Sequence, residues 1–266
     1  MTSANIYINA ISLVAPGLAG WQQSQSVLSG KEKYMAEALP KFSPAILPAN
    51  ERRRTTQLIK LALHAAEECL EFDLNTAQNY ATVFASSDGD HEIIDKICKA
   101  LTLPEHPVSP THFHNSVHNA PAGYWAIAAK AQRSSSSLSA CDESFAAGLV
   151  EAASFMLVEQ QPVLFVAYDY PAPAPLDSAR HLEAGFAVAM SISVNKDKNC
   201  IAELTLQLDS GNAYTQCSEP ALEQLRKGNP AARSLPLLQA IVNKTEQTIS
   251  LPHLQSTSLN IRVKKP

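Results

Sequence analysis

The chain has 266 residues, enough to bury a full hydrophobic core, and 45% of them are hydrophobic while 17% are charged. This balance is ordinary for a soluble globular protein, and a formal net charge of -4 gives no indication of binding to nucleic acid or to an acidic membrane surface. The N-terminus lacks the basic region of a signal peptide, and no segment has the apolar length of a transmembrane helix. Five widely spaced cysteines without a C-x-x-C pair favour a reduced, cytoplasmic protein over a disulfide framework or a zinc site.

The first part of the chain predicts one strand and two helices. The strand runs from Ile6 to the Pro16-Gly17 turn, and a short helix over residues 21–28 follows it. Residues 31–50 hold three prolines and show little periodicity, which predicts a loop. Residues 55–72 give the clearest helix, because six side chains recur on one face at the helical period: Leu58, Leu61, Ala62, Ala65, Cys69 and Phe72.

A buried strand is predicted over residues 80–86, and it ends at the turn Ser87-Asp88-Gly89-Asp90. A helix over residues 91–101 follows, with Asp90 placed to cap its first turn. We favour this interpretation over a calcium loop, because the turn is too short to supply the spaced oxygen ligands that calcium needs. A loop then leads to a helical segment of small residues that contains AGYWAIAAKA, residues 122–131.

The second half of the chain continues the alternation of strands and helices. A serine-rich strand over residues 134–140 precedes a helix over residues 142–159, and the unbroken apolar run PVLFVAY, residues 162–168, predicts a strand buried on both faces. Beyond it we predict strands over 185–194 and 201–208, helices over 220–227 and 235–246, and a closing edge strand over 258–263. This order predicts an α/β fold in which helices cover a mixed sheet.

The segment THFHNSVH brings His112, His114 and His118 close together in the sequence. On a helix, His114 and His118 would share a face as two metal ligands do, but Asn115 stands where the H-E-x-x-H motif needs a glutamate. No obvious carboxylate ligand follows, so we predict a surface or partner-facing cluster and no metal site. Because the chain also lacks glycine-rich phosphate-binding motifs and a G-x-S-x-G turn, no cofactor is predicted.

Cys141 is the candidate nucleophile, because it lies between a strand and the N-terminus of a helix. The unpaired amides and the dipole at a helix N-terminus favour a thiolate. The alternative for an arbitrary cysteine is a small, buried apolar side chain. Asp142 and Glu143 follow directly, and their charges oppose a neighbouring thiolate by about 0.3–1 kcal/mol each.

Several segments together make the chain resemble the β-ketoacyl synthases of the thiolase fold. Asn119-Ala-Pro-Ala122-Gly123 matches the N-x-x-A-G helix start of that family, and Ser139-Ala140-Cys141 matches the turn that carries its nucleophile. The segments RRRTTQLIKLALHAAEECL, YATVFASSDGD and PVLFVAYDY fit the neighbouring elements. The resemblance covers about residues 5–195 and implies a thiolase-like fold, N-terminal half only. We expect residues 1–266 to form a single domain of this type, with residues from about 200 to 266 as a divergent C-terminal extension.

The chain departs from the family in its histidines. Synthases carry two catalytic histidines in H-G-T-G-T and G-H motifs of their C-terminal half, whereas here His253 is the only histidine after His181 and has no such context. Without these groups, most of the stabilisation of the condensation transition state is missing. The resemblance therefore implies a non-catalytic subunit of the chain-length-factor type, as in aryl polyene and related type II polyketide or fatty acid systems, with a vestigial Cys141.

The same resemblance implies a heterodimer with a full-length β-ketoacyl synthase, which handles substrates carried by the acyl carrier protein. The strand before Cys141 would pair across the dimer axis, since a serine-rich strand can satisfy its backbone by pairing with another chain. The predicted interface residues are Ser134, Ser135, Ser136, Ser137, Leu138 and Ser139. The predicted lining of the partner's acyl tunnel is Tyr124, Trp125, Ile127 and Ala128; for the two aromatic residues the alternative is core packing.

Two other functions remain open from the sequence. One is an active cysteine acyltransferase, a truncated synthase that uses Cys141 with His114, His118 or His181. The other is a self-associating structural protein without a role in acyl chemistry.

Overall fold

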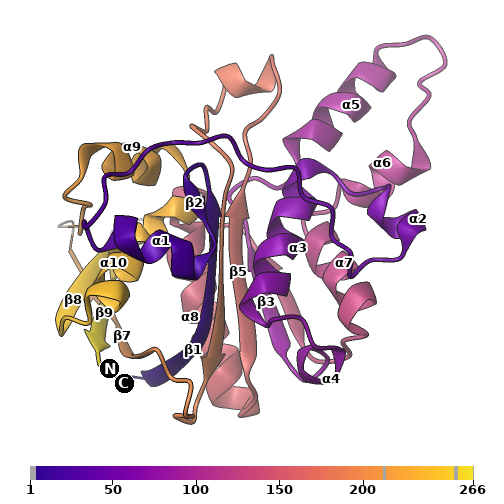
Figure 1. Cartoon of the computed structure of the whole chain (residues 1–266). Helices are drawn as coiled ribbons and strands as arrows, with labels where there is room; N and C mark the ends of the chain where they lie inside the picture. Colours follow the sequence, from indigo (N-terminus) through magenta and orange to yellow (C-terminus); the bar gives the residue numbers. More distant parts are fainter. Residues whose placement is uncertain (1–3, 212–213, 255–256, 266) are drawn as a thin grey trace.

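The fold is that of a computed structural model of the chain, which describes residues 4–211, 214–254 and 257–265. Its centre is one mixed sheet of nine strands with helices on both faces (Figure 1). The strand order is β4-β3-β5-β6-β1-β7-β9-β8, and β2 pairs with β1 beside this path. The strands are β1 (Ala4–Ala15), β2 (Leu18–Ala19), β3 (Ala81–Ala85), β4 (Ser135–Leu138), β5 (Val163–Asp169), β6 (Phe186–Ser193), β7 (Ala202–Ser210), β8 (Gln247–His253) and β9 (Thr257–Lys264).

Helix α3 lies on one face of the sheet and α8 on the other (Figure 1). The helices are α1 (Trp21–Leu28), α2 (Ala49–Arg52), α3 (Gln57–Cys69), α4 (Leu74–Ala77), α5 (His91–Leu101), α6 (Pro110–Asn115), α7 (Ala120–Ala129), α8 (Ser144–Glu159), α9 (Pro220–Gly228) and α10 (Leu235–Asn243). Short 3-10 turns cover Cys141–Glu143, Leu176–Ser178 and Ala231–Ser234. Over the ranges that the structure describes, no helix combines the length and apolar character of a membrane span.

Strand β5 separates two hydrophobic cores. Its Leu164 and Val166 join the cluster that contains α3, whereas Val163 and Phe165 join the cluster that contains α8. This division follows from the alternation of side chains along a strand. All residues of β5 are buried, so the prediction of a strand buried on both faces is confirmed.

The turn after β3 has the predicted capping role. The Ile93 N–H donates a hydrogen bond to Asp90 Oδ1 at 3.2 Å, which caps α5. The hydroxyl of Thr56 donates to the other carboxylate oxygen of Asp90, and the same hydroxyl accepts the Ile59 N–H at the start of α3. Asp90 therefore links the first turns of two helices.

The prediction of a closing edge strand is wrong. β9 lies between β7 and β8, and β8 forms the edge of the sheet. The sequence analysis missed β8, although its buried Ile249, Leu251 and His253 alternate with less buried residues at the period of a strand. Pro252 is tolerated there because an edge strand can lack a ladder hydrogen bond. Together β7, β8 and β9 extend the same sheet as β1.

Candidate functional site

Cys141 lies where the chain turns from the end of β4 into α8. Its φ of 49° falls in the left-handed region, which is uncommon for residues other than glycine. The 3-10 turn Cys141–Glu143 leads directly into α8, and the cysteine side chain is exposed. The predicted strand-to-helix turn is therefore confirmed, and the alternative of a small, buried apolar side chain is wrong.

Ser144, which the sequence analysis did not single out, holds this turn together. Its hydroxyl accepts a hydrogen bond from the Ala140 N–H at 2.9 Å and donates one to the Cys141 carbonyl at 2.7 Å. Ser144 itself is buried. Serine commonly makes such local bonds at the start of a helix, so its place three residues after the cysteine was a usable signal.

An ion-pair network engages the first acid after Cys141. The Arg180 guanidinium donates to Asp142 Oδ1 at 2.8 Å and also pairs with Asp88. Arg233 Nη2 lies 3.7 Å from the other oxygen of Asp142. Arg180 belongs to the connection between β5 and β6, and Arg233 to the 3-10 turn after α9. Asp142 therefore ties two distant connections to the cysteine turn.

Asp169, at the end of β5, is a buried carboxylate that braces the same region. Its Oδ1 accepts hydrogen bonds from the Ser87 N–H at 2.7 Å, the Ser87 hydroxyl at 2.8 Å and the Ser86 hydroxyl at 3.0 Å. Its Oδ2 accepts the Ala231 N–H at 3.2 Å. Burial raises the pKa of Asp169 to about 7, although these donors oppose the rise. The Ser87 carbonyl in turn accepts the Ser139 hydroxyl just before the cysteine turn.

Two of the candidate catalytic histidines bind other groups. His118 Nε2 lies 3.1 Å from the Ser86 carbonyl oxygen. His181 Nδ1 lies 2.9 Å from Asp177 Oδ1. Within the ranges that the structure describes, neither forms a hydrogen bond with Cys141.

The remaining histidines of interest lie on α6 and β8. The exposed His114 makes an edge contact with the Tyr124 ring at 6.3 Å between centroids, and His112 shares α6 with it. His253 is buried, which lowers its pKa, and its Nδ1 lies 3.1 Å from the Thr257 hydroxyl. No group of three or more histidine, cysteine or acidic side chains is placed to hold a metal ion, as far as the described residues extend.

The serine-rich strand β4 lies at an edge of the sheet. Only β3 is its neighbour among the strands of the described chain, and the two run parallel. The Ser134 hydroxyl donates to Glu159 at 2.6 Å, and Ser135 accepts the Thr82 hydroxyl at 2.8 Å. The Ser137 hydroxyl is buried with no hydrogen-bond partner among the described residues. One side of β4 therefore has no strand beside it in the described parts of the chain, and its pairing with another chain remains a prediction.

The side chains of the predicted tunnel residues divide between the buried and exposed faces of α7. Trp125 is fully buried and makes an edge-to-face contact with Phe72 at 5.6 Å between ring centroids. Tyr124 is buried in the same hydrophobic cluster. Ala128 is half-buried, whereas Ile127 is 49% exposed. Core packing therefore accounts for both aromatic side chains in the isolated chain, and a role in a tunnel remains a prediction.

The fold and the cysteine turn together define a ketosynthase-like protein with a thiolase-like fold. The family model of the β-ketoacyl synthase N-terminal domain matches residues 20–255. The chain belongs to this family, and the predicted fold class is confirmed. The comparison with curated proteins gave no match.

Solved structures of ketosynthase complexes resemble the chain along nearly its whole length. One chain of the complex between the ketosynthase ApeO and its chain length factor ApeC, from Xenorhabdus doucetiae, matches with a TM-score of 0.73 and 25% identity, covering 97% of this chain and 99% of that one. The AntDE:AntF complex of a type II polyketide acyl-carrier protein with its ketosynthase matches at 0.77 and 12% identity, covering 100% of both chains. The ishigamide ketosynthase/chain length factor matches with a TM-score of 0.74 and 12% identity, covering 98% of this chain and 99% of that one. At 12% identity, the last two likenesses show the fold alone.

Proposed function

We propose that the chain is a non-catalytic subunit of the chain-length-factor type in polyketide or fatty acid biosynthesis, of the aryl polyene kind. It pairs with a full-length β-ketoacyl synthase, which supplies the reactive cysteine and histidines. The partner also handles the substrates carried by the acyl carrier protein. The match to the ApeO–ApeC complex over 97% of the chain supports this proposal.

The environment of Cys141 is the observation that carries the non-catalytic role. A thiol nucleophile in acyl transfer needs a neighbouring base and donors for the developing oxyanion. Here His118 and His181 bind other groups. The residue after the cysteine is Asp142, whose carboxylate is engaged with Arg180. Among the described residues, no histidine forms a hydrogen bond with Cys141, so the turn has the position of a nucleophile without a hydrogen-bonded base.

The surface from β4 across α7 to α6 supports pairing with another subunit. One hollow of about 540 Å³ lies between β4 and α7, and a second of about 470 Å³ lies between α7 and α6. They share Asn119 and Gly123 in their linings. Phe113, Val117 and Ile127 line the second hollow and are 70%, 52% and 49% exposed. Apolar side chains gathered in this way are typical of protein–protein interaction sites.

The role of Cys141 is tested in the pathway reconstituted with the partner synthase. Cys141→Ala should leave the rate of chain extension unchanged. Cys98→Ala is the matched control, because it removes another exposed cysteine, on α5. An acyl group found on Cys141 by mass spectrometry, or extension lost with Cys141→Ala alone, would instead support the active acyltransferase.

Pairing is tested by co-purification with the synthase. Phe113→Glu places a charge in the proposed interface and should abolish the complex. Leu254→Glu is the matched control, since Leu254 is 50% exposed and directly follows β8, which lies at the opposite edge of the sheet from β4. A monomer that ignores the synthase, or a complex that survives Phe113→Glu, would contradict the proposed interface.

The tunnel role is best tested at Ile127, because its side chain is exposed and can be shortened without opening the core. Ile127→Ala should lengthen the acyl products and Ile127→Phe should shorten them. Trp125→Ala is a poorer probe, since truncating a buried tryptophan costs about 3–5 kcal/mol of stability. Products of unchanged length from both Ile127 variants would remove the tunnel role of this residue.

A further inference from the structure

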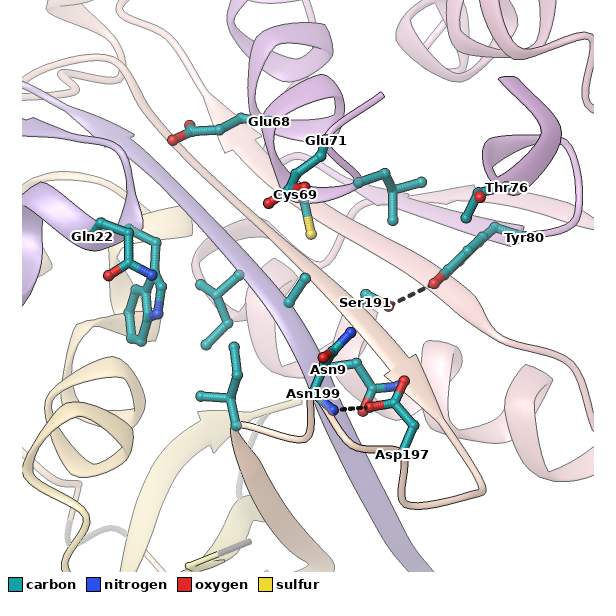
Figure 2. A pocket seen from close by; sticks show the side chains of 15 residues that line it. Asn9, Gln22, Glu68, Cys69, Glu71, Thr76, Tyr80, Ser191, Asp197 and Asn199 are labelled. Carbon is teal, nitrogen blue, oxygen red and sulfur yellow. Dashed lines mark hydrogen bonds between the residues drawn. The ribbon is translucent and has the colours of Figure 1, made fainter. Parts of the chain in front are cut away.

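A cavity of about 650 Å³, whose lining side chains Figure 2 shows, lies at the opposite end of the sheet from Cys141. Cys141 follows the carboxyl end of β4, which is parallel to β3. Tyr80, which lines the cavity, precedes the amino end of β3. Other parts of the wall come from β1, α1, the end of α3 and the β6–β7 turn. The volume is typical of a small-molecule site, and the proposed function makes no use of it.

The cavity lies beside an irregular stretch of β1. β7 pairs with β1 only as far as Ile8, and β2 begins to pair at Val14. Between them, the register of β1 against β6 shifts at Asn9, and such bulges often occur next to functional sites. The Asn9 side chain lines the cavity, and its Oδ1 is buried with no hydrogen-bond partner in the described ranges. The wall therefore contains an acceptor that the fold itself does not satisfy.

All charged side chains that line the cavity, among the described residues, are carboxylates: Glu68, Glu71 and Asp197. Glu68 accepts the Ser12 hydroxyl at 2.6 Å, and Asp197 accepts the Asn199 N–H at 2.6 Å. None of the three carboxylates takes part in an ion pair within the described parts of the chain. Unpaired carboxylates around a partly enclosed space attract cations.

The spacing of the carboxylates favours an organic cation over a metal ion. The described residues contain no group of three metal-binding side chains close enough to share an ion, so the three carboxylates are not placed to bind one metal ion together. Ile11, Trp21 and Ile201 supply an apolar wall between the polar groups. Cys69 lines the cavity as a neutral thiol, because burial raises its pKa to about 12.

We propose that this cavity binds an aliphatic diamine or polyamine. The ammonium groups bind the carboxylates of Glu68, Glu71 and Asp197, and the methylene stem lies against the apolar wall. This site is independent of the pairing surface on α6, α7 and β4, so either proposal can fail without the other.

The test is calorimetric titration of the full chain with 1,4-diaminobutane, with 1,4-butanediol as the uncharged analogue of the same length. The diamine should bind saturably and the diol should not. Glu71→Gln and Asp197→Asn should each weaken binding up to about fivefold, as expected for the loss of one partly exposed ion pair. Glu105→Gln is the matched control, because Glu105 is an exposed carboxylate between α5 and α6.

Three outcomes would overturn the proposal. The first is equal weakening by Glu105→Gln and Glu71→Gln, which indicates general attraction to a negative protein. The second is binding of the diol as tight as that of the diamine. The third is the absence of saturable diamine binding to the unmodified chain, which decides the question even if a cavity variant fails to fold. As a second readout, the diamine should change the fluorescence of a Trp125→Phe variant, in which Trp21 is the remaining tryptophan.

Discussion

Replacing Asp169 by asparagine should stabilise the chain above pH 7 and change its stability little at pH 4.5. Asparagine has nearly the same shape and keeps an oxygen that accepts the bonds from Ser86 and Ser87. It cannot ionise, so it resembles the protonated form of the aspartate. Its amide nitrogen faces the Ala231 N–H and cannot accept that hydrogen bond, whereas the hydroxyl oxygen of a protonated Asp169 still can. The substitution therefore carries a cost of about 1 kcal/mol at every pH, which offsets the gain of about the same size at pH 4.5.

The magnitude follows from the pKa of Asp169, which burial raises from 3.8 to about 7. Between these pH values the folded chain holds a proton that the unfolded chain has released. The free energy of unfolding therefore falls as the pH rises, and the loss is complete above the folded-state pKa. A shift of about 3 pH units, at about 1.36 kcal/mol each, sets an upper limit of about 4 kcal/mol.

Urea unfolding of both proteins at pH 4.5, 5.5, 6.5 and 7.5 measures this difference. Asp209→Asn is the control, because Asp209 is exposed, and its effect should stay within about 0.5 kcal/mol at every pH. A difference between Asp169→Asn and the parent chain that stays constant with pH would refute the reasoning. In that case the four hydrogen bonds to Asp169 outweigh its burial, and the carboxyl is ionised throughout.

Two further predictions concern packing and a buried ion pair. A Cβ on Gly148 would lie 2.6 Å from the Phe165 ring and 2.7 Å from the Ala85 Cβ. Gly148→Ala should therefore lower the free energy of unfolding, measured in urea, by about 1–3 kcal/mol. An unchanged midpoint of urea unfolding would contradict this prediction and show that α8 can shift away from the sheet. Arg226→Ala should cost about 3 kcal/mol at pH 7, because it removes both hydrogen bonds of 2.7 Å to Glu223. Arg226 lowers the pKa of Glu223 from 4.5 to about 2, so this contribution is present above pH 4.5 and is lost as the pH falls through 2; a cost that persists at pH 2 would contradict the ion-pair explanation.

Elements with a strong local pattern could be predicted from the sequence. The helix over residues 21–28 has the predicted bounds, and β5 is buried on both faces as its unbroken apolar run indicates. β8 was missed because its alternation extends over few residues and includes Pro252, and a proline within a run argues against a strand. Local periodicity determines which element forms, but the position of a strand in the sheet depends on contacts between distant segments. For this reason the sequence placed β9 at the edge, where the structure has β8.

The candidate site shows the same division between local and distant information. The turn at Cys141 is encoded within one short stretch, where a strand, small residues and the start of a helix follow one another. The ion-pair partner of Asp142 is not encoded in that stretch, because Arg180 lies 38 residues further along the chain. No periodicity or spacing rule connects the two residues, and only the fold brings them within hydrogen-bond distance.

Asp142 gives the cysteine turn a structural role that does not depend on synthase chemistry. Next to a nucleophile, its charge opposes the thiolate. In this fold, the same charge holds Arg180 and Arg233, which belong to the connections that follow β5 and α9. Each ion pair is partly exposed and contributes at most about 1 kcal/mol, but together they fix three segments of the chain relative to one another. If the turn is retained because Asp142 holds these segments together, Asp142→Ala should lower the melting temperature more than Cys141→Ala does. A larger drop with Cys141→Ala would indicate that the turn is retained for the cysteine itself.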